Sequence, residues 1–285
     1  MLCTCTKMGL CGVCLFVFLI FKRKIEMIIY SGKSQLDNQT DIVCIATGAE
    51  NNSNNIKTGG MLQTWVLNAN LDPVSANRTG ADISICGHCI HKGQPKNPNE
   101  NKGFARKRSC YVNLVFAPNQ IFKTYKRGGY PISQKRADIE DLSREKIVRL
   151  GAYGDPAAVP RDIWEDLLKY SSGHTGYSHQ IIDSNLQLNQ QFAPLADICM
   201  ISADTIEQAR IAWSQGLRTY RVVSDLSDVD RQKEIICPAS KEAGAITTCA
   251  KCKLCSGSKG KAQKARSVAI VVHGSGKSHF STNNN

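Results

Sequence analysis

Four cysteines near the carboxyl terminus have the spacing of metal ligands. They follow the pattern C-x11-C-x2-C-x2-C, and the first of them is followed by Pro238. A tetrahedral zinc site usually takes two ligands from each of two loops, whereas three of these four cysteines lie within seven residues. Closely spaced thiolates can instead bind different iron atoms of one iron–sulfur cluster. The set, called the carboxy-terminal set below, is Cys237, Cys249, Cys252 and Cys255.

The spacing of the carboxy-terminal set favours iron–sulfur ligation over zinc. A C-x2-C-x2-C run with a distant Cys-Pro is similar to the ligand run of bacterial ferredoxins, where it binds a cubane cluster. A cubane spreads its iron atoms over a larger volume than one zinc ion, so crowded thiolates can each reach an iron. We therefore predict a 4Fe-4S cluster at this set, with zinc as the alternative.

A second group, called the amino-terminal set, consists of Cys86, Cys89 and Cys110 in "CGHCIHKG" and "RKRSCYVN". One interpretation is a zinc site of three cysteines and one histidine, completed by the neighbouring His88 or His91. Another is a second 4Fe-4S cluster with three protein thiolates and one open iron, which can bind a substrate or cofactor directly. A purely structural site is the third alternative.

The cysteine count and the chain length bear on the compartment. A chain of 285 residues can bury enough apolar surface to fold without disulfides. Its thirteen cysteines are clustered in close pairs and triples, which suits metal ligation better than a disulfide framework. We therefore expect a reducing, cytoplasmic environment.

The formal charge of +12 is concentrated in one segment. Residues 101–137 contain nine Lys or Arg residues and no Asp or Glu. Such a segment attracts phosphates, so nucleic acid or a nucleotide is the partner that it predicts. A simple solvated face is the alternative, since no motif of a known nucleic-acid-binding module lies nearby.

Short apolar runs alternate with amphipathic helical segments from residue 61 onward. This alternation is typical of a parallel α/β fold. We predict either a partial (β/α)6-type barrel or an open parallel sheet, with cysteine-rich metal-binding loops. The predicted strands are Met61–Leu67, Lys146–Pro156, Ala196–Asp204, Leu217–Val223 and Ser267–Gly274, with His174–Gln180 as a further candidate.

The residues that could do chemistry follow these strands. In parallel α/β folds the working groups gather at the carboxyl ends of the strands. The amino-terminal set follows the strand predicted at Met61–Leu67, and the carboxy-terminal set follows the strand predicted at Leu217–Val223. Asp155, Asp204 and His273 end three of the others. Asp204 is also the predicted cap of the helix that follows it, with Glu207 three residues on.

We predict one main domain with extensions at both ends. Residues 61–274 form the predicted α/β metal-binding domain, after a polar lead-in at 27–60 and before a flexible tail at 275–285. Residues 1–26 are predicted to be an apolar extension that is not part of the native protein, whose natural start would be Met27. Its uncharged run at 8–21 would span about 21 Å as a helix, short of the roughly 30 Å hydrocarbon core. We therefore expect membrane contact only if this run is a true anchor.

Six segments of the chain resemble a family of uncharacterised bacteriophage and prophage proteins. They are "KTGGMLQTWVL", "GADISICGHC", "RSCYVN", "VRLGAYGDPAAVP", "TGYSHQ" and "CPASKEAGAITTCAKCKLC". The resemblance runs from about Val43 to Gly274. It implies a phage protein that works in the cytoplasm of the host cell, but it implies no activity.

A more distant resemblance is to radical S-adenosylmethionine enzymes. These are partial barrels with a three-cysteine cluster after the first strand, a Gly-Gly-Glu-Pro turn after the second, and in some members an auxiliary cluster. Here "YGDP" ends the second predicted strand, so the resemblance implies that Gly154 and Asp155 bind S-adenosylmethionine. The departure is in the cysteines, which are C-x2-C-x20-C here and C-x3-C-x2-C in that family. The resemblance implies an iron–sulfur enzyme; the alternative is a non-catalytic zinc protein that binds nucleic acid.

Overall fold

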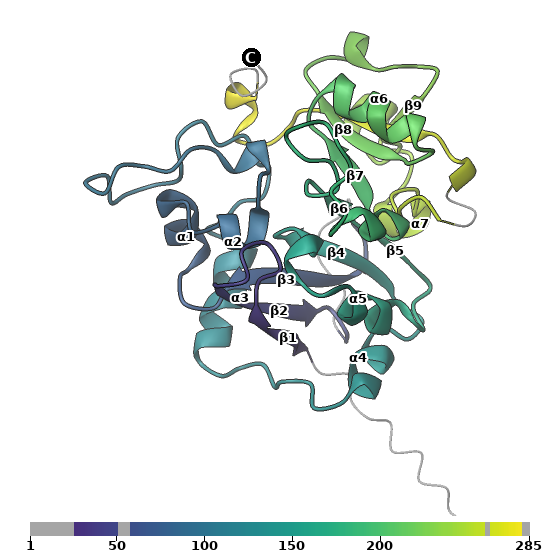
Figure 1. Cartoon of the computed structure of the whole chain (residues 1–285). Helices are drawn as coiled ribbons and strands as arrows, with labels where there is room; N and C mark the ends of the chain where they lie inside the picture. The colour runs from purple at the N-terminus through teal and green to yellow at the C-terminus, as the bar shows by residue number, and fades with distance from the viewer. Residues whose placement is uncertain (1–25, 51–57, 260–262, 281–285) are drawn as a thin grey trace, which may run out of the picture.

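The computed structural model describes residues 26–50, 58–259 and 263–280. These residues form two sheets, and the first sheet has five strands (Figure 1). The first three strands pair antiparallel, and the last three pair parallel. In spatial order the strands are β1 (Met27–Lys33), β2 (Asp41–Thr47), β3 (Leu62–Asn68), β4 (Ile147–Tyr153) and β5 (Gly173–Thr175).

The second sheet also has five strands, and all of them run parallel. Its strands are short, and the apolar ones are buried because helices or loops cover both faces. In spatial order they are β6 (Tyr177–Ser178), β7 (Met200–Ala203), β8 (Thr219–Val223), β10 (Ser267–Val271) and β9 (Glu234–Ile236).

A single residue, Gly176, joins the two sheets. Its carbonyl accepts a hydrogen bond from Met200 N at 2.9 Å, and its N–H donates to Cys255 O at 2.9 Å. A Cβ at this position would lie 2.8 Å from Cys199 Sγ, so only glycine fits. Across this junction β3, β4, β5/β6, β7, β8 and β10 follow one another as parallel strands. The predicted α/β class is confirmed, and this order is compatible with a partial barrel.

The described residues form seven α-helices, mostly short. Helix α1 has a defined cap at each end: it begins at the capping side chain of Asp72 and ends at Gly80, which has the left-handed conformation. The helices are α1 (Pro73–Thr79), α2 (Ile83–Cys86), α3 (Ala117–Lys126), α4 (Arg136–Leu142), α5 (Arg161–Leu168), α6 (Ile206–Ser214) and α7 (Cys249–Cys252).

Helix α6 begins one residue later than we predicted. The Thr205 side chain caps the helix by accepting a hydrogen bond from Gln208 N. The Gln208 side chain in turn accepts one from Thr205 N, which completes the capping box. The Asp204 backbone N–H also donates to Gln208 Oε1, at 2.6 Å. The carboxylate of Asp204 is therefore not used as the cap.

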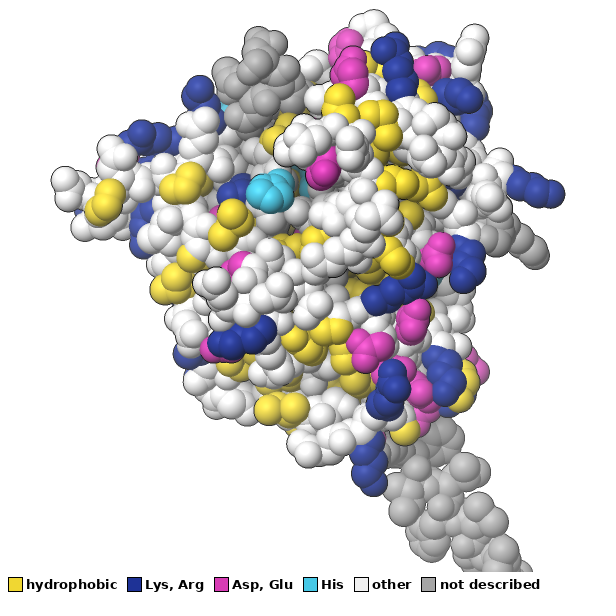
Figure 2. All heavy atoms as spheres, in the orientation of Figure 1, with side chains coloured by type: hydrophobic (Ala, Val, Ile, Leu, Met, Phe, Trp, Pro, Cys, Tyr) yellow, Lys and Arg dark blue, Asp and Glu magenta, His cyan; other side chains and the backbone are white. Residues whose placement is uncertain are grey.

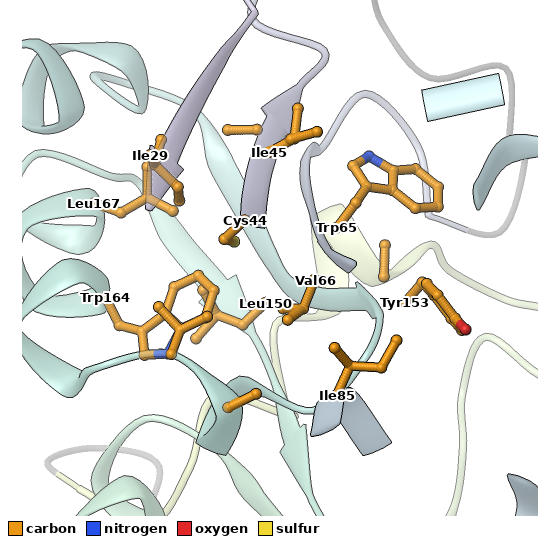
Figure 3. Packing of buried hydrophobic residues seen from close by; sticks show 14 of the residues in the cluster. Ile29, Cys44, Ile45, Trp65, Val66, Ile85, Leu150, Tyr153, Trp164 and Leu167 are labelled. Carbon is orange, nitrogen blue, oxygen red and sulfur yellow. The ribbon is translucent and has the colours of Figure 1, made fainter. Parts of the chain in front are cut away.

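The main core lies between the first sheet and the helices that cover it. Figure 3 shows Trp164 and Leu167 of α5 pointing toward Leu150 of β4 and Ile29 of β1. Both α5 side chains are fully buried, and Trp164 Nε1 donates to Pro156 O at 2.9 Å. Burying side chains of this size contributes about 2 to 3 kcal/mol each, so α5 fixes the segment that follows β4.

Residues 27–47 differ from the polar lead-in that we expected. They form β1 and β2, and residues 42–46 of β2 are all buried. The antiparallel pairing of β2 with β3 extends the first sheet beyond its parallel part. The main unit therefore begins at β1 and not at residue 61.

The chain ends also bear on the predictions. Lys277–His279 form a short 3-10 helix, and Phe280 is buried, so this part of the predicted tail is packed. The apolar run at 8–21 and residues 281–285 lie outside the described residues. Within the described ranges, no helix has both the length and the apolar character needed to cross a membrane.

Candidate active site

A cavity of about 390 Å³, called the central cavity, lies at the carboxyl ends of the parallel strands. Its wall includes residues that follow β4, β6, β7 and β10, as the parallel order requires. All three thiols of the amino-terminal set line it, together with Cys237 and Cys249 of the carboxy-terminal set. Two cysteine sets that are far apart in the sequence therefore face the same space.

The amino-terminal set is brought together by a folded-back loop. Cys86 ends α2, and Cys89 lies three residues further on. The chain then returns through a bridge between Gln94 and Arg106, whose N–H groups each donate to the other's carbonyl at 2.8 Å. Cys110 N in turn donates to His91 O at 2.9 Å. This bridge closes the unusually long gap between Cys89 and Cys110.

Gln180 holds the loop that contains Cys86. Its Nε2 donates to Cys86 O at 3.2 Å, and its Oε1 accepts from His88 N at 3.3 Å. Gly87 lies between them at φ +53°, and a Cβ there would approach Gln180 Oε1 to 2.3 Å. The Gly87 position therefore requires glycine for both its backbone conformation and the close approach of Gln180.

The turn after β4 braces the same loop. The Asp155 N–H donates to Ile85 O at 2.6 Å, and its carboxylate accepts from His179 N at 2.8 Å and Gln180 Nε2 at 3.3 Å. Gly154, at φ +80°, packs where a Cβ would lie 2.7 Å from Val66 Cβ. Both predicted cofactor-binding residues thus line the central cavity. The Asp155 side chain is engaged by the protein itself.

Burial raises the pKa of two thiols of the amino-terminal set, those of Cys86 and Cys110. It raises the pKa of Cys86 well above its ordinary value, and the nearby carboxylate of Asp82 raises it further. Burial also raises the pKa of Cys110, although Arg108 opposes this. Thiols in such surroundings ionise when a cation is there to hold the thiolate.

The carboxy-terminal set surrounds a second, much smaller space. All four thiols line a cavity of about 20 Å³ beside β6 and β10. Helix α7 contributes Cys249 and Cys252, and Thr248 caps it through a side-chain bond to Lys251 N. Burial raises the pKa of Cys255 to about 12, and the other three thiols are close enough to raise it as well. The four cysteines therefore border one small space, although no three sulfurs among the described cysteines lie within 4.8 Å of one another.

The structure adds two residues to the site that the sequence did not single out as a pair. His179, which follows β6, and Asp204, which follows β7, are 3.2 Å apart between Nδ1 and Oδ1. His91 Nε2 lies 3.7 Å from the same oxygen. Asp204 was expected at a strand end, whereas His179 was not a candidate and His88, a candidate, is exposed. The strand-end rule applied to His174–Gln180 was the signal that could have found His179.

The two histidines of this group differ in protonation. Burial, and then the neighbouring His179, lower the pKa of His91 to about 4, so it is neutral at neutral pH. Burial opposes the charge on His179 too, but Cys89 and Asp204 outweigh it and raise its pKa well above the ordinary value. The pKa values of these two neighbouring imidazoles are therefore shifted in opposite directions.

A cationic side chain lines the central cavity together with members of both cysteine sets. Arg149 of β4 lines the central cavity and donates a hydrogen bond to the hydroxyl of Tyr111. Burial opposes its charge, but Tyr111 and then Tyr177 raise its pKa. Within the described ranges no carboxylate forms an ion pair with Arg149. An arginine so placed is suited to bind an anionic group.

Part of the basic segment is used inside the protein. Arg108 is buried and donates to the carbonyls of Cys110 and Val112 at 3.0 and 2.6 Å. Arg106 pairs with Glu100, and Arg136 pairs with Asp166. The segment therefore contributes to the site first as a support for Cys110.

Searches of protein-family models, of curated proteins and of solved structures gave no match for the chain.

Proposed function

We propose that the protein is an iron–sulfur enzyme of the radical S-adenosylmethionine type, in which the amino-terminal set holds a 4Fe-4S cluster with one open iron. The observation that carries the proposal is the arrangement of both cysteine sets around one cavity at the carboxyl ends of parallel strands. The cysteine loop follows β3 and the Gly-Asp-Pro turn follows β4, as in the family that the sequence resembles. When bound, such a cluster supplies the electron that cleaves S-adenosylmethionine.

The spacing of the thiols does not match the coordination sphere of a single zinc ion. Sulfurs around one tetrahedral zinc lie about 3.8 Å apart, given Zn–S bonds of about 2.3 Å. Among the described residues, no three cysteine sulfurs lie within 4.8 Å of one another. Thiolates that bind different iron atoms of a cubane are spaced more widely. We assign the closed carboxy-terminal set to an auxiliary 4Fe-4S cluster on the same ground.

The remaining groups of the cavity support a role for the protein in binding and orientation. The backbone of Gly154 borders the cavity beside Cys86, where it can accept the amino group of a bound S-adenosylmethionine. Asp155 orients the loop that carries Cys86 and does not need to touch the ligand. Arg149 would bind a phosphate or carboxylate of the substrate, which makes an anionic substrate such as a nucleotide the best-supported class.

Anaerobic purification with analysis of iron, sulfide and zinc tests the metal content. We expect iron and sulfide, and formation of 5′-deoxyadenosine when the reduced protein is mixed with S-adenosylmethionine. Cys86→Ala should abolish this product. Cys44→Ala, which removes a buried thiol outside both sets, should retain it.

Two outcomes would overturn the proposal. One is product formation by Cys86→Ala at the rate of the unchanged protein. The other is one or two zinc ions per chain without sulfide, which would support the zinc-stapled, nucleic-acid-binding alternative. The exposed Lys102, Lys107, Lys123 and Arg127 of the basic segment would then be the residues to test for nucleic-acid contact.

A further inference from the structure

Three side chains at the rim of the amino-terminal set form a compact group, and one of them, His179, also contacts Cys89. His91, His179 and Asp204 each offer one ligand atom, and these atoms all lie within 4.8 Å of one another. The group is formed by three different segments, namely the loop after α2 and the residues directly after β6 and β7. Its members are 12 to 18% exposed at their side chains. The three side chains therefore converge at the cavity wall and do not form a cluster of surface acids.

The separations match the coordination sphere of one ion. Ligand atoms about 2.1 Å from a transition metal lie about 3.0 to 3.4 Å apart in octahedral or tetrahedral geometry. Asp204 Oδ1 is 3.2 Å from His179 Nδ1 and 3.7 Å from His91 Nε2. The first of these separations lies in that range and the second lies slightly above it, while the ligand atoms of His91 and His179 lie within 4.8 Å of each other.

The rest of each side chain is held in the orientation that ligation needs. The second ring nitrogen of His91, Nδ1, lies 2.9 Å from Ser109 Oγ, and the ring stacks on Phe280 at 5.7 Å between centroids. His179 is fixed by its backbone bond to Asp155. Metal-binding histidines typically have the nitrogen that does not bind the metal held by such a partner. Thr205 caps α6, which leaves the Asp204 carboxylate available.

We propose that His91, His179 and Asp204 bind one divalent transition metal ion, zinc or iron(II), separately from the cysteine sets. Two histidines and one carboxylate are the donor set of catalytic zinc sites and of mononuclear iron(II) sites, which leave coordination positions open. The three residues line the central cavity, so the open positions face the space in which a substrate would bind. The ion would then hold an oxygen atom of that substrate or of a water molecule. The proposal stands whether or not the amino-terminal set binds a cluster.

Titration of the anaerobically purified, full-length protein with Co²⁺ tests the proposal. In the difference spectrum of the cluster-loaded protein with and without Co²⁺, we expect one equivalent to bind with weak visible d–d bands and without new near-ultraviolet bands of the kind that thiolate ligands give. His91→Ala should weaken this binding at least about 100-fold, because removing a ligand exceeds the roughly 10- to 100-fold effect of removing a supporting group. Ser109→Ala should weaken it about 10-fold.

The matched control is His88→Ala, which removes an exposed histidine from the same loop and should leave Co²⁺ binding unchanged. Asp204→Asn keeps the shape of the side chain, so its loss of binding separates ligation from folding if His91→Ala unfolds. Binding that survives both His91→Ala and Asp204→Asn would overturn the proposal. So would a thiolate spectrum that is lost in Cys86→Ser alone.

Discussion

The two cysteine sets use the same side chain in contrasting surroundings. The amino-terminal set lies on the wall of the central cavity and is held by hydrogen bonds from Gln180 and by the turn after β4. The carboxy-terminal set surrounds a cavity of about 20 Å³ and contributes two thiols to a small hydrophobic cluster. The first has three thiols beside open space, and the second has four around almost none.

This difference predicts a chemical role for the amino-terminal set and a structural role for the carboxy-terminal set. A ligand set with one position missing and a cavity beside it can bind a further molecule, whereas a complete and enclosed set contributes mainly to folding. The carboxy-terminal set ties the end of β9, helix α7 and the junction at Gly176 to one another. We therefore expect changes in that set to act first on stability and changes in the amino-terminal set to act first on activity.

The largest expected effect on stability is at the carboxy-terminal set. If the carboxy-terminal set binds a cluster as proposed, Cys255→Ala should lower the free energy of unfolding by several kcal/mol, because metal binding at a closed site contributes to the free energy of folding. Cys110→Ala should lower it by less than half as much. Denaturant unfolding of the metal-loaded proteins measures both, and Cys44→Ala reports the effect of losing a buried sulfur alone. Equal losses at Cys255 and Cys110 would break the distinction between the sets.

A smaller effect is expected at the loop that carries Cys86. Gly87→Ala should destabilise the protein by about 1 to 3 kcal/mol and reduce metal retention at the amino-terminal set, because the new Cβ meets Gln180 in a strained backbone conformation. Gly128→Ala is the matched control. It also has a positive φ, +71°, but no atom lies within 4 Å of the new Cβ. Metal analysis and unfolding of the two variants should differ, and similar values would show that Gln180 does not hold the loop.

The smallest effect concerns pH and the region beside the carboxy-terminal set. Burial lowers the pKa of His174 below its ordinary 6.5, and the ring Nε2 lies 3.0 Å from Ile198 O. The unfolded chain therefore takes up this proton at a higher pH than the folded chain does. Stability that is present above about pH 6.5 should be lost as the pH falls through the folded pKa.

The test compares the free energy of unfolding at pH 7.5 and 5.5. His174→Gln should lose less stability on acidification than the unchanged protein, whereas exposed His88→Gln should behave like it. His91 contributes in the same direction, so the His174 variant should remove only part of the pH dependence. An unchanged dependence in His174→Gln would contradict the role of this histidine.

The sequence predicted the parts of the molecule that depend on short-range patterns. The alternation of apolar strands and helices predicted the α/β class, and the strand-end rule placed Asp155 and Asp204 at the cavity. Cys44 and Cys199, which belong to neither cysteine set, are fully buried. These features follow from local periodicity and from the common direction of parallel strands, which a single sequence contains.

The features that depend on long-range contacts were missed. Residues 27–47 are part of the first sheet because β2 pairs with β3. The polar stretch that separates β2 from β3 in the sequence concealed this pairing. His179 reaches Asp204 through the bend at Gly176, which periodicity does not indicate. The helix cap was displaced by one residue because Thr205 and Asp204 are both good capping residues, and Gln208 bonds back to Thr205.

The single-residue junction at Gly176 has a consequence for the order in which the protein is assembled. The strands of the first sheet end at Thr175, and those of the second begin at Tyr177, so each sheet is continuous in the sequence. During synthesis the first sheet can form while the second is still absent, because amino-terminal units fold first. Cys86, Cys89 and Cys110 belong to that first part, while Gln180 and His179 follow the junction. If these thiols hold a cluster as proposed, they are accessible to it from open solution before the opposite wall of the cavity exists.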